Sequence, residues 1–178
     1  NDGAIVYGLG ALKSIGLKAM DEIVKIREAK TSFTNIHEFF ERIGPRYLNK
    51  RAVETLAASG AFDKIDKNRA KIFAAAEQLM AHANATNNDE NTNQASLFGE
   101  DAVPPRVPIP EIEMWNDQTR LAQEFAAVGF FLSGHPLDDL AEELALRKTI
   151  FIANVEDYMQ TSEAVFRMAG VVRAAKER

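Results

Sequence analysis

Cysteine is absent from this chain of 178 residues, which excludes disulfide bonds and thiolate metal sites. A chain without cysteine is typical of a reducing compartment, so we expect a cytoplasmic protein. No apolar run approaches the roughly 20 residues that cross a bilayer, and we therefore expect no membrane partner. The chain does not begin with Met or with a signal peptide, which indicates a segment of a longer protein.

Arrangements of residues that carry catalysis are also missing. The three histidines, His37, His82 and His135, lack the sequence spacing of metal ligands. No glycine-rich loop ends in a phosphate-binding lysine. Adjacent acids such as Asp138 and Asp139 are more typical of helix ends than of a two-metal site. The sequence therefore predicts no catalytic residue, no metal site and no cofactor within this chain.

Positive charge is scarce overall but unevenly distributed. The formal net charge is -5. Residues 1–80 hold 13 Lys and Arg against 10 Asp and Glu, a net charge of +3, whereas residues 81–178 hold 8 against 16, a net charge of -8. A surface that binds nucleic acid is therefore expected in the first part of the chain.

Hydrophobic residues make up 46% of the chain and mostly recur at helical spacing, which predicts a mainly α fold. In residues 1–81 several short repeats of this kind follow residues that favour helix N-caps. We expect Thr34, Asn49 and Asp66 to be such caps, and Gly60 to end the helix that Asn49 begins. This part of the chain is predicted to be a bundle of short helices.

The composition changes at residue 82, where asparagines and then prolines accumulate. We expect a disordered linker over residues 82–112, because its apolar content is too low for a core. Helical spacing returns after it and predicts a short helical connector over residues 113–148. An apolar strand pattern over 164–172 would need further strands, so residues 149–178 are expected to begin a truncated β-domain.

Residues 10–19, Gly-Ala-Leu-Lys-Ser-Ile-Gly-Leu-Lys-Ala, resemble the helix-hairpin-helix motif. In this motif a turn without large side chains brings the N–H groups of the second helix close to a phosphate. Lys13 and Lys18 would add charge, and such contacts hold DNA without reading its sequence. Gly16 matches the pattern, but Ser14 stands where glycine is common. A simple corner between two helices is the open alternative.

A second basic turn, Asn49-Lys50-Arg51, opens a later helix. Lys50 and Arg51 oppose the dipole at a helix start, but they would suit a phosphate bound there. A solvated basic turn is the alternative. Because helix-hairpin-helix motifs commonly occur in pairs, a tandem arrangement is predicted over residues 1–81.

The predicted linker contains the pentapeptide Gln94-Ala95-Ser96-Leu97-Phe98. It resembles the bacterial sliding-clamp-binding peptide, in which Gln, any residue, and Ser or Asp are followed by Leu and Phe. Leu97 and Phe98 would fill an apolar pocket, each contributing roughly 1.5–3 kcal/mol, and Gln94 would hydrogen-bond at its edge. The alternative is that Leu97 and Phe98 pack back onto the helices.

These motifs stand in one order with two further peptides, Ser59-Gly60-Ala61-Phe62-Asp63 and Ser133-Gly134-His135-Pro136-Leu137. That order resembles the alpha subunit of bacterial DNA polymerase III, the C-family replicative polymerase, over essentially the whole chain. The resemblance implies a tandem helix-hairpin-helix domain, an internal clamp-binding motif and the start of an oligonucleotide-binding (OB) fold.

The resemblance also implies a function. This segment would bind duplex DNA and dock the beta sliding clamp for processive synthesis, beside other replicase subunits. Nucleotidyl transfer would belong to the parent DNA polymerase, whose catalytic carboxylates and Mg²⁺ would lie upstream. Two alternatives remain open: a helix-hairpin-helix segment of a DNA repair enzyme, and a purely structural helical connector. A repair enzyme would need catalytic acids or a lysine nucleophile, and a connector would bind neither DNA nor clamp.

Overall fold

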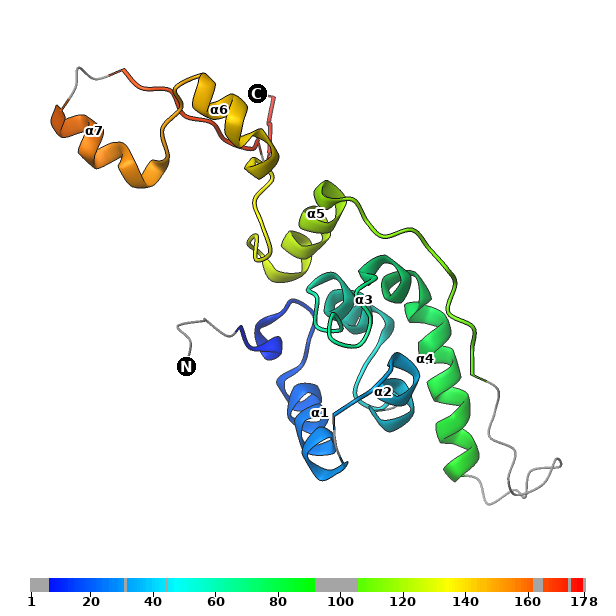
Figure 1. The fold of residues 1–178 in the computed structure, drawn as a ribbon. Helices are drawn as coiled ribbons and strands as arrows, with labels where there is room; N and C mark the ends of the chain where they lie inside the picture. The colour runs from blue at the N-terminus through cyan, green and yellow to red at the C-terminus, as the bar shows by residue number, and fades with distance from the viewer. Residues whose placement is uncertain are drawn as a thin grey trace. The chain divides into compact units, whose positions relative to one another are not determined.

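The computed structural model describes residues 7–30, 32–43, 45–91, 106–161, 165–172 and 174–177. The chain divides into unit 1, which ends at Leu132, and unit 2, which begins at Ser133 (Figure 1). Over the described residues the regular structure is helical, and the mainly α prediction is confirmed. None of the helices in these ranges is both long and apolar enough to cross a membrane.

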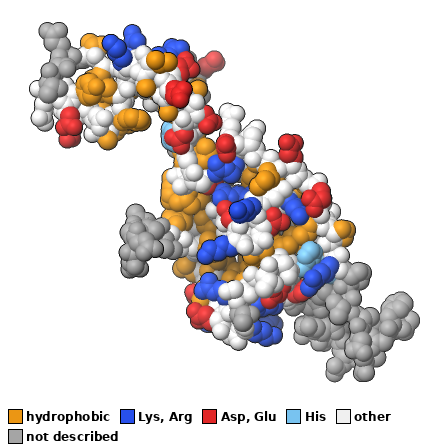
Figure 2. Space-filling view, in the orientation of Figure 1, with side chains coloured by type: hydrophobic (Ala, Val, Ile, Leu, Met, Phe, Trp, Pro, Cys, Tyr) orange, Lys and Arg blue, Asp and Glu red, His pale blue; other side chains and the backbone are white. Residues whose placement is uncertain are grey.

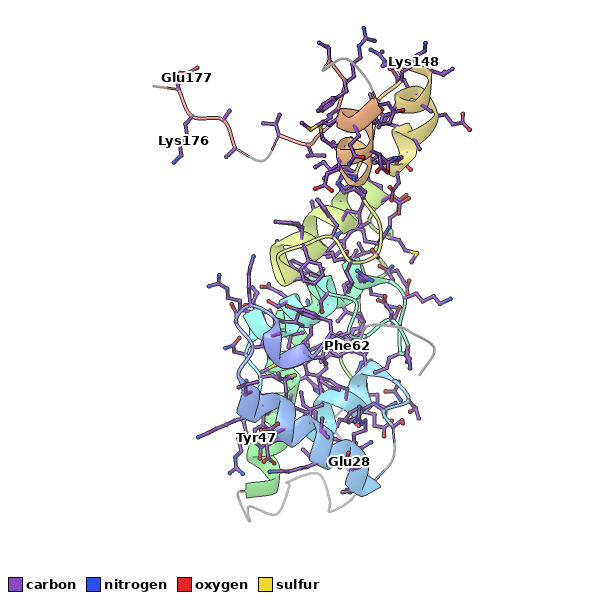
Figure 3. The ribbon with its side chains drawn as sticks, turned by 90° about the vertical axis from the view of Figure 1, so that its left-hand side faces the viewer. Glu28, Tyr47, Phe62, Lys148, Lys176 and Glu177 are labelled. Atoms are coloured by element: carbon purple, nitrogen blue, oxygen red, sulfur yellow. The ribbon has the colours of Figure 1, made fainter. Side chains whose placement is uncertain are left out.

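Unit 1 contains a 3₁₀ turn and several α-helices around one core. In chain order they are η1 (Leu9–Ala11), α1 (Leu17–Lys30), α2 (Ile36–Ile43), α3 (Lys50–Ala58), α4 (Arg69–Asn91) and α5 (Asp117–Val128). The side chains of Phe40, Leu56 and Ile72 are almost completely buried in this core. Phe62 points into it, and its ring centroid lies 5.0 Å from that of Phe39 (Figure 3).

The ends of α3 follow the prediction. The side chain of Asn49 accepts a hydrogen bond from the N–H of Ala52 at 2.9 Å, as an N-cap does. Gly60 has a φ of 81°, which is the left-handed conformation that commonly follows a helix. A side chain at Gly60 would also collide with the guanidinium of Arg69, so this position requires glycine on both grounds.

Two other predicted caps are wrong. Asn35, not Thr34, accepts the N–H of Glu38 at the start of α2. Asn68, not Asp66, caps α4, whereas Asp66 accepts the N–H of Asn68 in the preceding turn. In both places two residues suited to capping stand close together, and the one next to the first helical turn reaches its free N–H groups.

Helix α4 continues through Asn91, past the predicted linker boundary at residue 82. Residues 106–116, which we call the strap, then return along α4 within unit 1 (Figure 1). The carbonyl of Val107 lies 2.9 Å from Nε2 of His37 on α2, and Nδ2 of Asn68 donates to the carbonyl of Ile112 at 2.6 Å. Much of the predicted linker is therefore part of unit 1.

Unit 2 consists of short helical pieces. They are η2 (Asp138–Leu140), α6 (Ala141–Leu146), η3 (Ile152–Asn154) and α7 (Val155–Thr161). The strand predicted over 164–172 does not form in the described residues, because the only pairing there is one bridge between Thr149 and Arg167. A strand needs a full partner to be stable, so the start of an OB fold stays a prediction.

Candidate nucleic-acid interface

The first predicted hairpin consists of η1, a tight turn and the start of α1. The carbonyl of Leu12 accepts the N–H of Ile15 at 3.4 Å and closes the turn, while the Leu12 side chain is buried in the core. The carbonyl of Gly16 accepts the N–H groups of Ala19 and Met20, so α1 begins directly after Gly16. A Cβ on Gly16 would meet no described atom within 4 Å. The start of α1 is therefore open to an approaching anion.

The tip of this turn is formed by Lys13 and Ser14. Ser14 has a φ of 62°, a region in which residues other than glycine are uncommon. The N–H of Lys13 donates to the carbonyl of Ala127 at 3.3 Å, and its Nζ donates to the carbonyl of Ala126 at 3.0 Å. Both carbonyls belong to the last turn of α5, so Lys13 joins the hairpin to that helix.

The second hairpin consists of α2, the turn that precedes Asn49, and α3. Nζ of Lys50 lies 2.7 Å from Oε2 of Glu77 on α4, and this hydrogen bond and charge raise the pKa of Lys50. The side chains of both residues are largely exposed, so the ion pair contributes little to stability. Lys50 thus already has an acidic partner that a phosphate would have to replace.

A shallow hollow of about 200 Å³ joins the two hairpins. Lys13 and Ser14 line it from the first hairpin, Arg51 lines it from the second, and Gln123 lines it from α5. Glu54 lines it as well, so two cationic side chains face one anionic one. Figure 2 shows the wider setting, in which Lys and Arg side chains on unit 1 lie among Asp and Glu side chains.

The other four predicted DNA-binding residues do not line this hollow. Gly16 and Lys18 lie at the exposed start of α1, outside the residues that line the hollow. Asn49 uses its side chain to cap α3, and Lys50 is paired with Glu77. The structure thus brings together Lys13, Ser14 and Arg51 only.

A buried network that the sequence did not reveal holds α5 against this site. Nη1 of Arg69 lies 3.1 Å from Oε2 of Glu124, a carboxylate on α5 that is completely buried. The same guanidinium forms two hydrogen bonds to Asp63 and a third to the carbonyl of Ala58. The other carboxylate oxygen of Glu124 accepts the N–H of Leu132 at 2.7 Å. Arg69 therefore ties the end of α3 to α5.

One sequence signal could have identified this network. Glu124 follows Leu121 by three residues and precedes Val128 by four, which places a carboxylate on the apolar face of its helix. A charge at such a position requires a buried partner. Nothing in the sequence marks Arg69 as that partner, because the contact spans 55 residues.

The predicted clamp-binding residues, Gln94, Ser96, Leu97 and Phe98, lie outside the described residues. Their neighbours in the sequence are described: α4 ends at Asn91, and the strap begins at Arg106. Nε of Arg106 lies 3.2 Å from Oε1 of Glu41 on α2. Both flanks of the pentapeptide therefore belong to unit 1, the unit that carries the hairpins.

In the ranges that the structure covers, no three acidic or histidine side chains lie close enough to hold a metal ion. His37 contacts the strap, and Nδ1 of His135 accepts the N–H of Leu137 at 3.2 Å in a turn. These two contacts are structural in character.

Comparison with known proteins gives the same motif and one family. A helix-hairpin-helix motif family matches residues 1–72. The DNA polymerase III subunit alpha of Caulobacter vibrioides is 43% identical over 177 residues, which cover 99% of this chain. The chain is a homologue of one segment of the DNA polymerase III alpha subunit. The alpha subunit of Neisseria meningitidis serogroup B is 37% identical over 98% of the chain, and that of Vibrio cholerae is 32% identical over 81%.

The resemblance predicted from the motifs is thereby confirmed. The chain spans 16% of the length of the Caulobacter alpha subunit and 15% of the Neisseria one. Within this alpha-subunit segment, the helix-hairpin-helix match extends from before η1 to the first turn of α4. The strap and α5 lie beyond the matched residues, although α5 contacts the first hairpin through Lys13.

Proposed function

We propose that this segment is a non-catalytic part of a replicative DNA polymerase that binds the backbone of duplex DNA without sequence preference and docks the beta sliding clamp. The observation that carries the DNA-binding part is that the two hairpins share one surface, since Lys13 and Ser14 at the tip of one and Arg51 of the other line a common hollow. Two hairpins that face one surface can contact the backbone of one duplex at two places. Contacts of this kind position a protein on DNA and carry no sequence information.

Electrostatics argue for weak binding by this segment alone. The excess of +3 over residues 1–80 is small, and Glu54 stands beside Arg51 in the hollow. Each neutralised phosphate changes the slope of log affinity against log salt by about -0.9, so phosphate contacts by the exposed side chains of Lys18, Lys50 and Arg51 would give a slope of about -3. Weak binding through this few phosphate contacts suits a polymerase that must slide along its product.

The DNA-binding proposal is tested by titrating the protein with a short duplex at several salt concentrations. We expect a slope of about -3 that is the same for unrelated sequences. Gly16→Val should lower the affinity about tenfold, because the side chain would block the open start of α1 without meeting a described protein atom. Gly8→Val is the matched control, since Gly8 also has no atom within 4 Å of an added Cβ. A flat salt response would contradict the proposal.

The clamp-binding part rests on the pentapeptide and on its place in the chain. Gln94 to Phe98 stand between Asn91, where α4 ends, and Arg106, where the strap begins and pairs with Glu41 of α2. A peptide so placed would join clamp binding and DNA binding in one unit. Each contact could then be weak, because the first to form raises the effective concentration for the second.

Leu97→Ala combined with Phe98→Ala tests this part. We expect at least about a hundredfold weaker binding to the purified clamp, since two buried apolar side chains contribute roughly 3 kcal/mol or more. Thr92→Ala with Asn93→Ala is the control, because it makes two alanines just before the motif. If the two double variants bind the clamp equally well, the pentapeptide is not the docking site.

The parent activity follows from the same proposal. Nucleotidyl transfer and its Mg²⁺ would belong to the rest of the polymerase, as would contacts with other replicase subunits. The relatives bear the name of a polymerase subunit, and this chain matches 15–16% of their length. The alternative of a purely structural connector predicts that neither titration shows binding.

A further inference from the structure

The first hairpin holds an unfavourable backbone conformation at its tip. Ser14 is the third residue of the turn closed by Leu12 and Ile15, and its φ is 62°. Turns with a positive φ at this position favour glycine. Another L-residue there is disfavoured by a factor of roughly 5 to 30 in population. Surrounding contacts must therefore hold Ser14 in this conformation.

The contacts come from Lys13, the residue beside it. Its N–H and its Nζ donate to the carbonyls of Ala127 and Ala126, the last turn of α5. Gly129, with a φ of 102°, ends this helix, and a Cβ there would lie 4.0 Å from Cε of Lys13. A lysine at a helix C-terminus is also favoured by the helix dipole. Both the backbone N–H and the side chain of Lys13 therefore attach the turn to the end of α5.

The surroundings of Nζ are poor for a phosphate. The ammonium faces the carbonyl end of α5, which carries partial negative charge, and Glu54 lines the same hollow. An anion bound to Lys13 would have to face both. At the start of α1, by contrast, Lys18 is exposed and the helix dipole favours an anion.

We propose that Lys13 is a positioning residue: by joining the turn to the end of α5, it holds Ser14 in the left-handed conformation and keeps the hairpin in its DNA-binding shape. Helix α5 then helps to maintain the shape of the first hairpin, although it lies outside the residues matched by the motif family. Arg69 and Glu124 hold that helix in place. The inference rests on the proposed DNA binding.

The test measures duplex affinity against salt for the full-length protein that contains this segment. Lys13→Met should lower the affinity about two- to fivefold, the effect of a cation at a helix end, and leave the salt slope unchanged. Lys18→Met removes the same charge from the start of α1 and should change the slope by about 0.9. In a Ser14→Gly background, Lys13→Met should have less than about a twofold effect, because glycine adopts positive φ without help.

A second readout does not require DNA. Hydrogen exchange at the Lys13 amide should speed up in Lys13→Met, since its bond to Ala127 loses the support of Nζ. If Lys13→Met changes the salt slope by about 0.9 and Ser14→Gly gives no rescue, Lys13 contacts a phosphate and the inference is overturned. Unchanged exchange and affinity would overturn it as well. If the unaltered protein shows no salt-dependent binding to duplex, it is the proposed DNA binding that fails.

Discussion

The two units use apolar residues in different ways. In unit 1 the side chain of Phe40 is 2% exposed, whereas in unit 2 the side chains of Phe151 and Ile152 are 77% and 78% exposed. The helices of unit 2 have six and seven residues, too few to be stable without packing against something else. Helical spacing in a sequence therefore predicts a helix, but burial depends on how many faces the neighbouring elements cover.

Unit 1 achieves that coverage through segments far apart in the sequence. The C-terminal part of α5 and the residues of the strap close its core on the side of α3 and α4. In particular, the ring of Trp115 lies 5.4 Å from that of Phe73, and Ile109 packs against the core. We therefore expect comparable substitutions to lower the free energy of unfolding much more in unit 1 than in unit 2.

The largest difference is expected for one substitution made in both units. Phe40→Ala should destabilise the protein by about 3–5 kcal/mol, because it removes a buried ring and leaves a cavity. Phe151→Ala should change the free energy of unfolding by less than about 0.5 kcal/mol, since its ring is already in water. Urea unfolding of both variants checks this. Equal losses would mean that Phe151 is covered in the protein.

The sequence predicts features that depend on neighbouring residues, but not contacts between residues far apart in the chain. Apolar spacing predicted short helices over residues 1–81 and within 113–148, where α1, α2, α3 and α5 form, and the Asn49 cap is confirmed. These features depend on residues within one helix. The anchoring of Lys13 could not be predicted in this way. Its partner Ala126 is 113 residues away, and only the packed core brings the two together.

The strap illustrates a signal that was present but misinterpreted. Its proline content is typical of a linker, but Pro108 and Pro110 alternate with Val107 and Ile109. The prolines are exposed, while Val107 and Ile109 are half-buried. Proline has no N–H to satisfy and a fixed φ, so it suits an extended segment lying on a helix. This alternation of apolar residues and prolines, with a period of two, indicates an extended segment with one buried side, which composition alone does not show.

A second test compares charged residues in the two units. Arg69→Met would leave the buried Glu124 without its cation, and breaking a buried pair of this kind costs about 3–5 kcal/mol. Arg147→Met removes an arginine from a pair with Glu143 on α6, where the two side chains are 67% and 55% exposed. We expect that loss to be at most about 0.5 kcal/mol.

Chemical denaturation of both arginine variants measures the difference. Arg69→Met should also release the peptide that follows α5, since Glu124 accepts the N–H of Leu132. Faster hydrogen exchange at Leu132 would report that release without depending on global stability. A small loss in Arg69→Met would mean that the carboxyl of Glu124 does not depend on Arg69, and the proposed buried pair would then be wrong.

The smallest expected effect is the pH dependence of stability that comes from Glu38, which pairs with Arg42 in unit 1. Glu38 and Arg42 stand four residues apart on α2, as Glu143 and Arg147 do at the end of α6. Only Glu38 also accepts two hydrogen bonds from Thr34, through the hydroxyl at 2.6 Å and the N–H at 2.8 Å. These bonds, with that from Arg42, lower the pKa of Glu38 to about 2. A hydrogen-bonded carboxylate favours its charged form.

Since the pKa of Glu38 is lower in the folded protein than its ordinary value of 4.5, its stabilising effect is complete above that value and is lost as the pH falls towards about 2. Thr34→Val removes the hydroxyl, the largest cause of the shift, and should raise the pKa part of the way back. An NMR titration of the Glu38 carboxyl measures it directly. Thr55→Val is the control, because that hydroxyl donates to the carbonyl of Arg51 within α3. A Glu38 pKa still near 2 in Thr34→Val would instead assign the shift to Arg42 and the N–H of residue 34. In that case the urea unfolding midpoint would depend on pH in the same way in both threonine variants.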